Sequence, residues 1–261
     1  MTSVRVFFVG GLISYRALFS FMSPAVFVPT LILTPIFQIL LFAYIGRAAH
    51  LRSDEFYVVG NAMQYSAVPC LFAMTQTIAG ERFQQTLGYI LVSPAGRLPL
   101  FLGRALPVIL NGFFVAGFSL IVGGLILGVT FPVATLAPLA LVVAVATLSC
   151  TGFGLINAGL GLRIRETSVL SNILVGVLLI FSGANVPAAS LPAWMQHIAS
   201  GLPLTHAIRA ARLVADGSSI GAVGGLLGRE LAVGLIYGVV GLGIIRFFEW
   251  QSRQHASLGI A

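Results

Sequence analysis

The chain contains no lysine, and all 14 of its basic residues are arginine. The phosphate-binding P-loop needs a lysine after its last glycine, because that side chain reaches the nucleotide phosphates. This chain therefore cannot supply a P-loop. If nucleotide hydrolysis drives its activity, a separate polypeptide binds the nucleotide, and we expect no cofactor in this chain.

Charge of either sign is also scarce. Only 8% of the residues are charged and 58% are hydrophobic, with a mean hydropathy of +1.02, whereas soluble domains carry about 25% charge. A soluble core could not bury this much apolar surface, so we expect one all-α integral membrane domain over residues 1–261. The arginines lie scattered at the ends of apolar runs, which fits membrane orientation and argues against a nucleic-acid partner.

Cysteine is limited to Cys70 and Cys150, and both lie inside apolar runs. Two such residues form neither a disulfide framework nor the ligand spacing of a metal site. We therefore expect two buried thiols and no metal.

The uncharged runs predict six membrane spans. No charged residue occurs between residues 105 and 162, and as one helix this stretch would be about 87 Å long, against a bilayer core of about 30 Å. It must fold back, and Thr130-Phe131-Pro132 is the expected turn. The other spans are expected near residues 25–45, 56–80, 167–183 and 222–245.

Three further elements accompany these spans. An apolar stripe within residues 4–19 predicts an amphipathic interfacial helix at the N-terminus. Prolines divide residues 183–201 into pieces too short to cross, which predicts an extracellular re-entrant element between the fifth and sixth spans. The uncharged part of the last span is short, so we expect Arg229 and Glu230 at the outer membrane edge, paired or snorkelling.

The distribution of arginine predicts the orientation. Nine arginines lie on the side of the termini and five on the other side. Positive charge is enriched in cytoplasmic segments. We therefore expect a multi-pass membrane protein with both termini and residues 80–97 in the cytoplasm.

A polar island, GERFQQTLGYILVSPAGR at residues 80–97, separates the second and third spans. Its apolar residues recur at helical spacing, and Glu81, Arg82, Gln84 and Gln85 take the other face. A short interfacial helix with a free polar face can contact a cytoplasmic partner. The alternative is a surface loop that only connects two spans, with Glu81 and Arg82 as a solvated ion pair.

The second span carries a polar and aromatic stripe that includes Asn61, Gln64, Tyr65 and Phe72. Polar side chains at membrane depth face protein or a water-filled cavity. One interpretation is the wall of a substrate pathway. The other is hydrogen bonding between packed helices, which we favour for any single residue but not for the stripe as a whole.

Two stretches resemble type-2 ABC exporter permeases. The island and the residues after it resemble the first cytoplasmic loop of that family, although Gln84, Gln85 and Thr86 stand where the family often has an acidic residue or a Gly-Thr pair. FSGANVPAASLPAWMQHIASGLPLTHAIRAARLV resembles its second, more specific hallmark. The matching positions are Ser182, Gly183, Pro187, Leu191, Pro192, Trp194, Pro203, Leu204, Thr205 and Arg212.

The resemblance implies the membrane subunit of an ATP-driven exporter of drugs, natural products, lipo-oligosaccharides or polysaccharides. It implies two copies of a separate ABC ATPase that hold ATP and Mg, a second permease copy or homologue, and an amphipathic or hydrophobic substrate that moves by alternating access. Membrane lipid is a further expected partner. The island would act as a coupling helix, together with Arg163, Arg165 and Glu166, and the family's fifth-span pathway adds Asn172 and Phe181 as candidates.

Two other classes are alternatives. A membrane enzyme acting on lipid needs a cluster of ionisable groups at one depth, and Arg209, Arg212, His197, His206 and Asp216 come nearest to one. A secondary transporter would use acids inside its spans, where Glu230 is the candidate.

Overall fold

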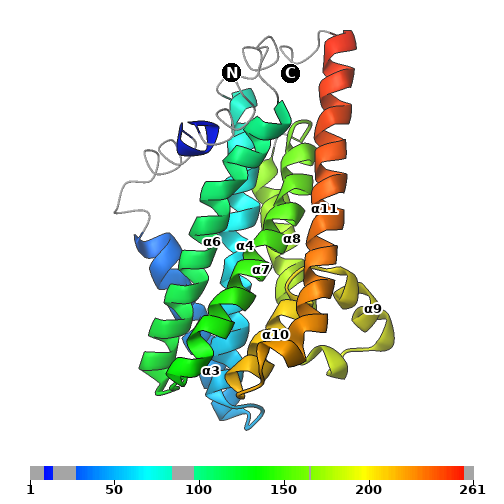
Figure 1. Cartoon of the computed structure of the whole chain (residues 1–261). Coiled ribbons are helices and arrows are strands. Elements are labelled where there is room, and N and C mark those ends of the chain that lie inside the picture. The colour runs from blue at the N-terminus through cyan, green and yellow to red at the C-terminus, as the bar shows by residue number, and fades with distance from the viewer. Residues whose placement is uncertain (1–8, 14–27, 84–96, 165, 256–261) are drawn as a thin grey trace.

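The computed structural model describes residues 9–13, 28–83, 97–164 and 166–255, and within these ranges the chain is helical with no β-strand (Figure 1). After the short helical segment at 9–13, the elements are a π-helix η1 (Val28–Leu33), α3 (Thr34–Ala48), α4 (Asp54–Phe83), α6 (Arg97–Leu127), α7 (Val133–Gly161), α8 (Thr167–Phe181), a 3-10 turn η2 (Ala188–Ser190), α9 (Ala193–Gly201), α10 (Thr205–Ala215) and α11 (Ile220–His255). The expected all-α class is confirmed.

Four helical stretches are long and apolar enough to cross a membrane: Leu31–Ala48, Gly103–Leu127, Val133–Gly161 and Ile220–Phe248. α4 is also long, at 30 residues, but its amides and hydroxyls make it more polar, and α8 has 15 residues. The chain is therefore a multi-pass membrane protein, and the six-span layout stays a prediction.

The long helices form one bundle with two distinct ends. The C-terminal ends of α4, α7 and α11 and the N-terminal end of α6 lie at the top of Figure 1, and the α3–α4, α6–α7 and α10–α11 connections lie at the bottom. The α6–α7 turn lies at residues 128–132, where the sequence predicts the chain to fold back. Gly128 makes this reversal with a φ of +73°, a conformation that other residues rarely adopt.

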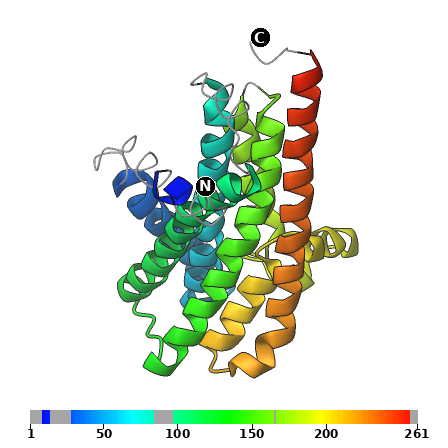
Figure 2. The ribbon, with the colours of Figure 1, turned by 45° about the horizontal axis from the view of Figure 1, so that its top comes forward.

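α7 lies in the centre of the bundle between α4 and α11 (Figures 1 and 2). Small residues let these backbones approach closely. A Cβ at Gly152 would lie 2.3 Å from the Gly234 carbonyl oxygen of α11, and one at Gly154 would lie 2.5 Å from the Cys70 carbonyl oxygen of α4. Cys70 and Cys150 are free, fully buried thiols at these contacts, as expected.

The first span begins at a helical irregularity that contains Pro29 and is followed by Pro35 at the start of α3. The π-helix η1 leads into α3, and the Thr34 hydroxyl donates to the Pro29 carbonyl at 2.9 Å. Of the expected N-terminal interfacial helix, the structure describes residues 9–13, which are helical. Gly11 packs there against the Gly103 carbonyl of α6, and the rest of that prediction falls outside the described residues.

The segment between α8 and α11 consists of short pieces, as expected. η2 and α9 have 3 and 9 residues, so neither can cross a bilayer. In both views of the ribbon, α9 stands to the side of the bundle (Figures 1 and 2), where it contacts α8 and α10. Its extracellular position stays a prediction.

Candidate functional site around helix α4

The two amides of the α4 stripe are buried and hydrogen-bonded to neighbouring segments. Asn61 accepts a hydrogen bond from Gln38 Nε2 of α3 at 2.9 Å and donates one to Asn185 Oδ1 at 2.9 Å. Gln64 accepts from the Ser182 hydroxyl at 3.1 Å and donates to the Val175 carbonyl at 3.4 Å. These bonds tie α4 to α3, to α8 and to the segment that follows α8.

A second polar cluster joins α4 to α7 and α8 nearer the other end of the bundle. The Asn157 Nδ2 of α7 donates to the Thr75 hydroxyl of α4 and to the Ser171 hydroxyl of α8, both at 2.7 Å. All three side chains are buried. Unpaired polar groups are costly in an apolar interior, so this cluster favours one arrangement of the three helices.

The other stripe residues lie in different surroundings. Tyr65 is buried in a small cluster with Leu31 and Val115, whereas Phe72 is half-buried. On α8, Asn172 is exposed, and the half-buried Phe181 ring meets Trp194 edge-on with centroids 6.4 Å apart. Asn61 and Gln64 therefore form hydrogen bonds between packed segments, as the second interpretation expects. The role of the stripe in a substrate pathway stays a prediction.

Arg212 of α10 fastens the loop after α8 to the start of α4. Its Nη1 donates to the Gly183 carbonyl at 2.9 Å, and its Nη2 donates to the carbonyls of Ala184 at 2.7 Å and Phe56 at 3.3 Å. The guanidinium carbon also lies 3.5 Å from the Phe56 ring centroid. Burial, with a smaller effect of Arg52, lowers the pKa of Arg212 to about 10, so it stays cationic at neutral pH.

Two glycines make this arrangement possible. Gly183 has a φ of +84°, which turns the chain as it leaves α8. Gly60 of α4 faces the loop, and a Cβ there would lie 2.2 Å from the Ala184 carbonyl oxygen and 2.7 Å from Arg212 Nη2. The hallmark residues Gly183 and Arg212 therefore meet at one junction, although they are 29 positions apart.

The prolines of the second hallmark each lie just before one of the short helices between α8 and α11. Pro187 precedes η2, Pro192 precedes α9, and Pro203 comes two residues before Thr205, the first residue of α10. Proline fixes φ and lacks an amide hydrogen, so it suits positions before or at a helix start.

Glu230 of α11 caps the N-terminus of α10. Its carboxylate accepts the amide hydrogen bonds of Leu204 at 2.8 Å and Ala207 at 3.1 Å. A carboxylate is favourable at this end of a helix, where backbone N–H groups lack helical partners. Glu230 is fully buried, so the expectation that it snorkels to water is wrong, and its hydrogen-bond partners are backbone amides of α10 and the residue before it. Its neighbour Arg229 is exposed.

Among the residues expected to contact an ATPase, those that the structure describes lie at the top end of the bundle in Figure 1. Glu81 and Arg82 are in the last turn of α4, and Gln84, Gln85 and Arg165 fall outside the described residues. Arg163 donates to Gln251 Oε1 of α11 at 2.6 Å and lies 5.4 Å from the Phe248 ring centroid, while Glu166 is exposed before α8. Their contact with a partner stays a prediction.

Sequence reasoning missed the partners that complete these networks. Sequence patterns do not single out Asn157, Ser171 or Asn185, and they do not identify the backbone amides that Glu230 binds. A polar residue inside an apolar run is the available signal, since such a group must find a hydrogen-bond partner. Its partner, however, lies on a distant helix and cannot be read from local spacing.

Comparisons with known proteins match the region that contains the hydrogen bonds of α4 and the junction at Arg212. The model of the family described as "ABC-2 type transporter" matches residues 24–215. A protein described as "Probable multidrug ABC transporter permease YbhR" from Escherichia coli (strain K12) is 29% identical over 154 residues, and the match covers 55% of this chain and 41% of that relative. The protein of the same description from Escherichia coli O157:H7 matches equally.

The matched part spans about two fifths of the length of these relatives. The family model, by contrast, covers well over half of this chain and includes α4, α8, α10 and the junction at Arg212. The chain therefore belongs to the ABC-2 type transporter family.

Proposed function

We propose that this chain is the membrane-spanning subunit of an ATP-driven exporter in a bacterial cytoplasmic membrane. It moves an amphipathic or hydrophobic substrate outward by alternating access. Family membership supports a transport role, and the described function of the relatives, multidrug transport, supports an amphipathic substrate.

The observation that carries this proposal is the continuity of α4. It runs as one helix of 30 residues from Asp54 to Phe83, about 45 Å at ~1.5 Å per residue. Its first half holds Asn61 and Gln64, and its last turn holds Glu81 and Arg82. A force applied at the Phe83 end therefore moves the hydrogen-bonded junction with α3 and α8.

Two ABC ATPase chains supply that force in the proposed complex. They hold ATP and Mg, because this chain has no lysine for a P-loop. Glu81, Arg82, Gln84 and Gln85 contact the ATPase as a coupling helix, and Arg163, Arg165 and Glu166 add a second contact. A second permease copy or homologue completes the complex and lines the pathway from the other side.

The accessible part of the pathway surface lies between the two polar clusters. Phe72 and Asn172 are at the same level, since each lies within three residues of the Thr75–Asn157–Ser171 cluster. Both retain accessible surface, whereas Asn61 and Gln64 are buried in hydrogen bonds. We assign substrate contact to Phe72, Asn172 and Phe181, which retain accessible surface, and positioning of α4 to Asn61 and Gln64. Tyr65 is buried beside Leu31 and Val115 and is given no contact.

The test is purification of the tagged full chain from its host, followed by transport in inside-out vesicles. A P-loop ATPase should co-purify, and a fluorescent amphipathic dye from a screened panel should enter the vesicles only while ATP is hydrolysed. The control is the same complex with the P-loop lysine of the ATPase replaced. Isolation of the chain without an ATPase, or uptake that follows a proton gradient when the ATPase is inactive, would contradict the proposal.

A further inference from the structure

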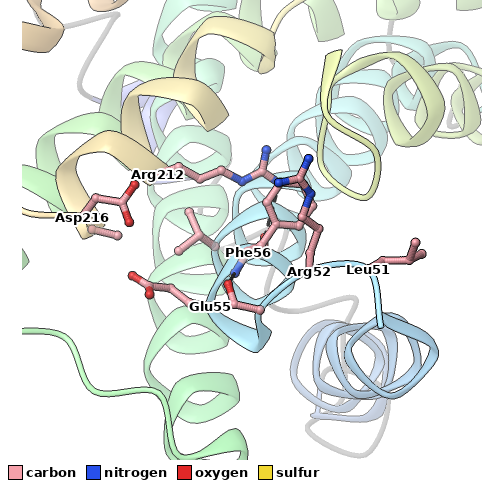
Figure 3. A pocket seen from close by; sticks show the side chains of 9 residues that line it. Leu51, Arg52, Glu55, Phe56, Arg212 and Asp216 are labelled. Atoms are coloured by element: carbon pink, nitrogen blue, oxygen red, sulfur yellow. Dashed lines mark hydrogen bonds between the residues drawn. The ribbon is translucent and has the colours of Figure 1, made fainter. Parts of the chain in front are cut away.

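A pocket of about 350 Å³ opens at the end of the bundle where α3 joins α4 (Figure 3). Its walls come from the α3–α4 loop, the first turns of α4 and the end of α10, and Phe56 lies in the middle of them. Small-molecule sites usually occupy about 300–1,000 Å³, so the pocket can hold a compact polar group.

Two arginines share the Phe56 ring at one side of the pocket. The guanidinium carbons of Arg212 and Arg52 lie 3.5 and 5.8 Å from the ring centroid. Arg212 uses its Nη atoms on backbone carbonyls, and its Nε is buried with no hydrogen-bond partner. Within the described ranges, the Arg52 guanidinium forms no hydrogen bond and no ion pair. These two neighbouring positive charges, with no acidic side chain between them, favour the binding of an anion.

Two carboxylates occupy the opposite side. Figure 3 shows Glu55 and Asp216 on the far side of Phe56 from the guanidinium of Arg52. Their like charges repel each other, and among the residues that the structure describes neither carboxylate accepts a hydrogen bond or forms an ion pair within 4 Å. Asp216 also attracts the Arg212 guanidinium electrostatically at longer range. The neighbouring Asp54 differs, because it pairs with Arg47 through bonds of 2.9 and 3.0 Å from Arg47 Nε. The negative charges of Glu55 and Asp216 therefore favour the binding of a cation.

We propose that this pocket binds a zwitterionic headgroup that carries a phosphate and a primary ammonium, as phosphoethanolamine does. The phosphate lies against the Arg52 guanidinium, which can bind phosphate oxygens directly, and within the positive field of the neighbouring Arg212. The ammonium lies between Glu55 and Asp216. The carboxylates would repel a simple anion, and the arginines would repel a simple cation. A ligand that carries both charges is therefore the best electrostatic match to the pocket.

The chemistry also favours a primary ammonium over a quaternary one. A primary ammonium donates three hydrogen bonds, which two carboxylates can accept. A quaternary ammonium donates none and binds instead over aromatic faces, but here the Phe56 ring already carries guanidinium groups.

The surroundings of the pocket point to a bilayer lipid as the source of this headgroup. Leu51 lines the pocket and is 64% exposed, and the last turns of α3 expose Tyr44 and Ile45. Tyr44 and Ile45 belong to the candidate span Leu31–Ala48, which leads directly into the loop that carries Leu51 and Arg52. A lipid can place its headgroup in the pocket and its chains along α3. The same headgroup chemistry could also come from a free soluble molecule.

The test is a lipid titration of the purified full chain, read by native mass spectrometry. We expect phosphatidylethanolamine to bind about tenfold more tightly than phosphatidylglycerol or phosphatidylcholine, since charge-assisted hydrogen bonds to the ammonium are lost with either. Arg52→Gln should weaken phosphatidylethanolamine binding about tenfold. Asp216→Asn should remove the preference over phosphatidylglycerol. The matched control is Arg209→Gln, because Arg209 is an exposed arginine on α10 one helical turn before Arg212. This variant should leave lipid binding unchanged.

Soluble O-phosphoethanolamine separates the two sources. Binding of the lipid with weak competition by the soluble compound supports a lipid site, and binding of the soluble compound alone supports the same chemistry with a free ligand. Equal binding of all three lipids together with no binding of the soluble compound would overturn the proposal. A preference that survives both Arg52→Gln and Asp216→Asn would also overturn it. The site stands apart from ATP-driven export, so failure of either proposal leaves the other intact.

Discussion

Glu230 illustrates why an ionisable residue occurs inside an apolar helix of this chain. Its carboxylate takes the amide hydrogen bonds of Leu204 and Ala207, which open α10. Leu204 itself has a φ of +75°, a strained conformation for a branched residue. The buried charge therefore fixes the start of the helix that carries Arg212.

Glu230→Ala should destabilise the protein because two buried amide groups lose their acceptor. Each such loss costs about 1–3 kcal/mol, so the midpoint of thermal unfolding should fall clearly below that of wild type. The matched control is Arg229→Gln, since Arg229 is the adjacent, exposed residue, and it should leave the midpoint unchanged. Equal midpoints for Glu230→Ala and wild type would show that the cap does not stabilise α10.

Gln64 and Phe72 should respond differently to substitution. Gln64→Leu leaves the buried Ser182 hydroxyl without its partner, which should cost about 1–3 kcal/mol of stability. Phe72 is only half-buried, so Phe72→Ala should change transport more than stability. Thermal unfolding and transport per folded complex would be measured for both variants. A large stability loss with unaltered transport in Phe72→Ala would place Phe72 in ordinary helix packing.

At the scale of elements, the junction depends on the close approach of α4 to the loop after α8. Gly60→Ala would place a methyl group 2.2 Å from the Ala184 carbonyl oxygen. The backbone must shift to make room, at a cost of about 1–3 kcal/mol. Gly117→Ala on α6 is the control, because nothing lies within 4 Å of its Cβ position. If both variants unfold at the same temperature, the close approach at Gly60 is not a constraint on the fold.

The sequence predicts the elements better than their connections. Uncharged runs locate the helices, and Thr130-Phe131-Pro132 locates the α6–α7 turn, because lipid imposes a length on every span. The contacts of Arg212 with Gly183 and of Asn61 with Asn185 join residues 29 and 124 positions apart. Such pairings depend on how the bundle packs, and no local pattern encodes them.

For the whole molecule, the arginine bias predicts the orientation. A cysteine at Gly96 should react with a membrane-impermeant reagent only from the cytoplasmic side, and one at Ala189 only from outside. The native Cys70 and Cys150 are fully buried, so the background labelling should be low. The reverse pattern would contradict the orientation and the placement of residues 80–97 beside an ATPase.

In the proposed complex, the last turn of α4 receives the force of an ATPase. The most direct test is Glu81→Ala combined with Arg82→Ala, followed by co-purification with the ATPase and by substrate-stimulated ATP hydrolysis in the reconstituted complex. We expect membrane insertion to be normal, while ATPase association or stimulation falls well below wild type. Unchanged association together with unchanged stimulation would contradict the claim and show that residues 80–97 only connect two spans.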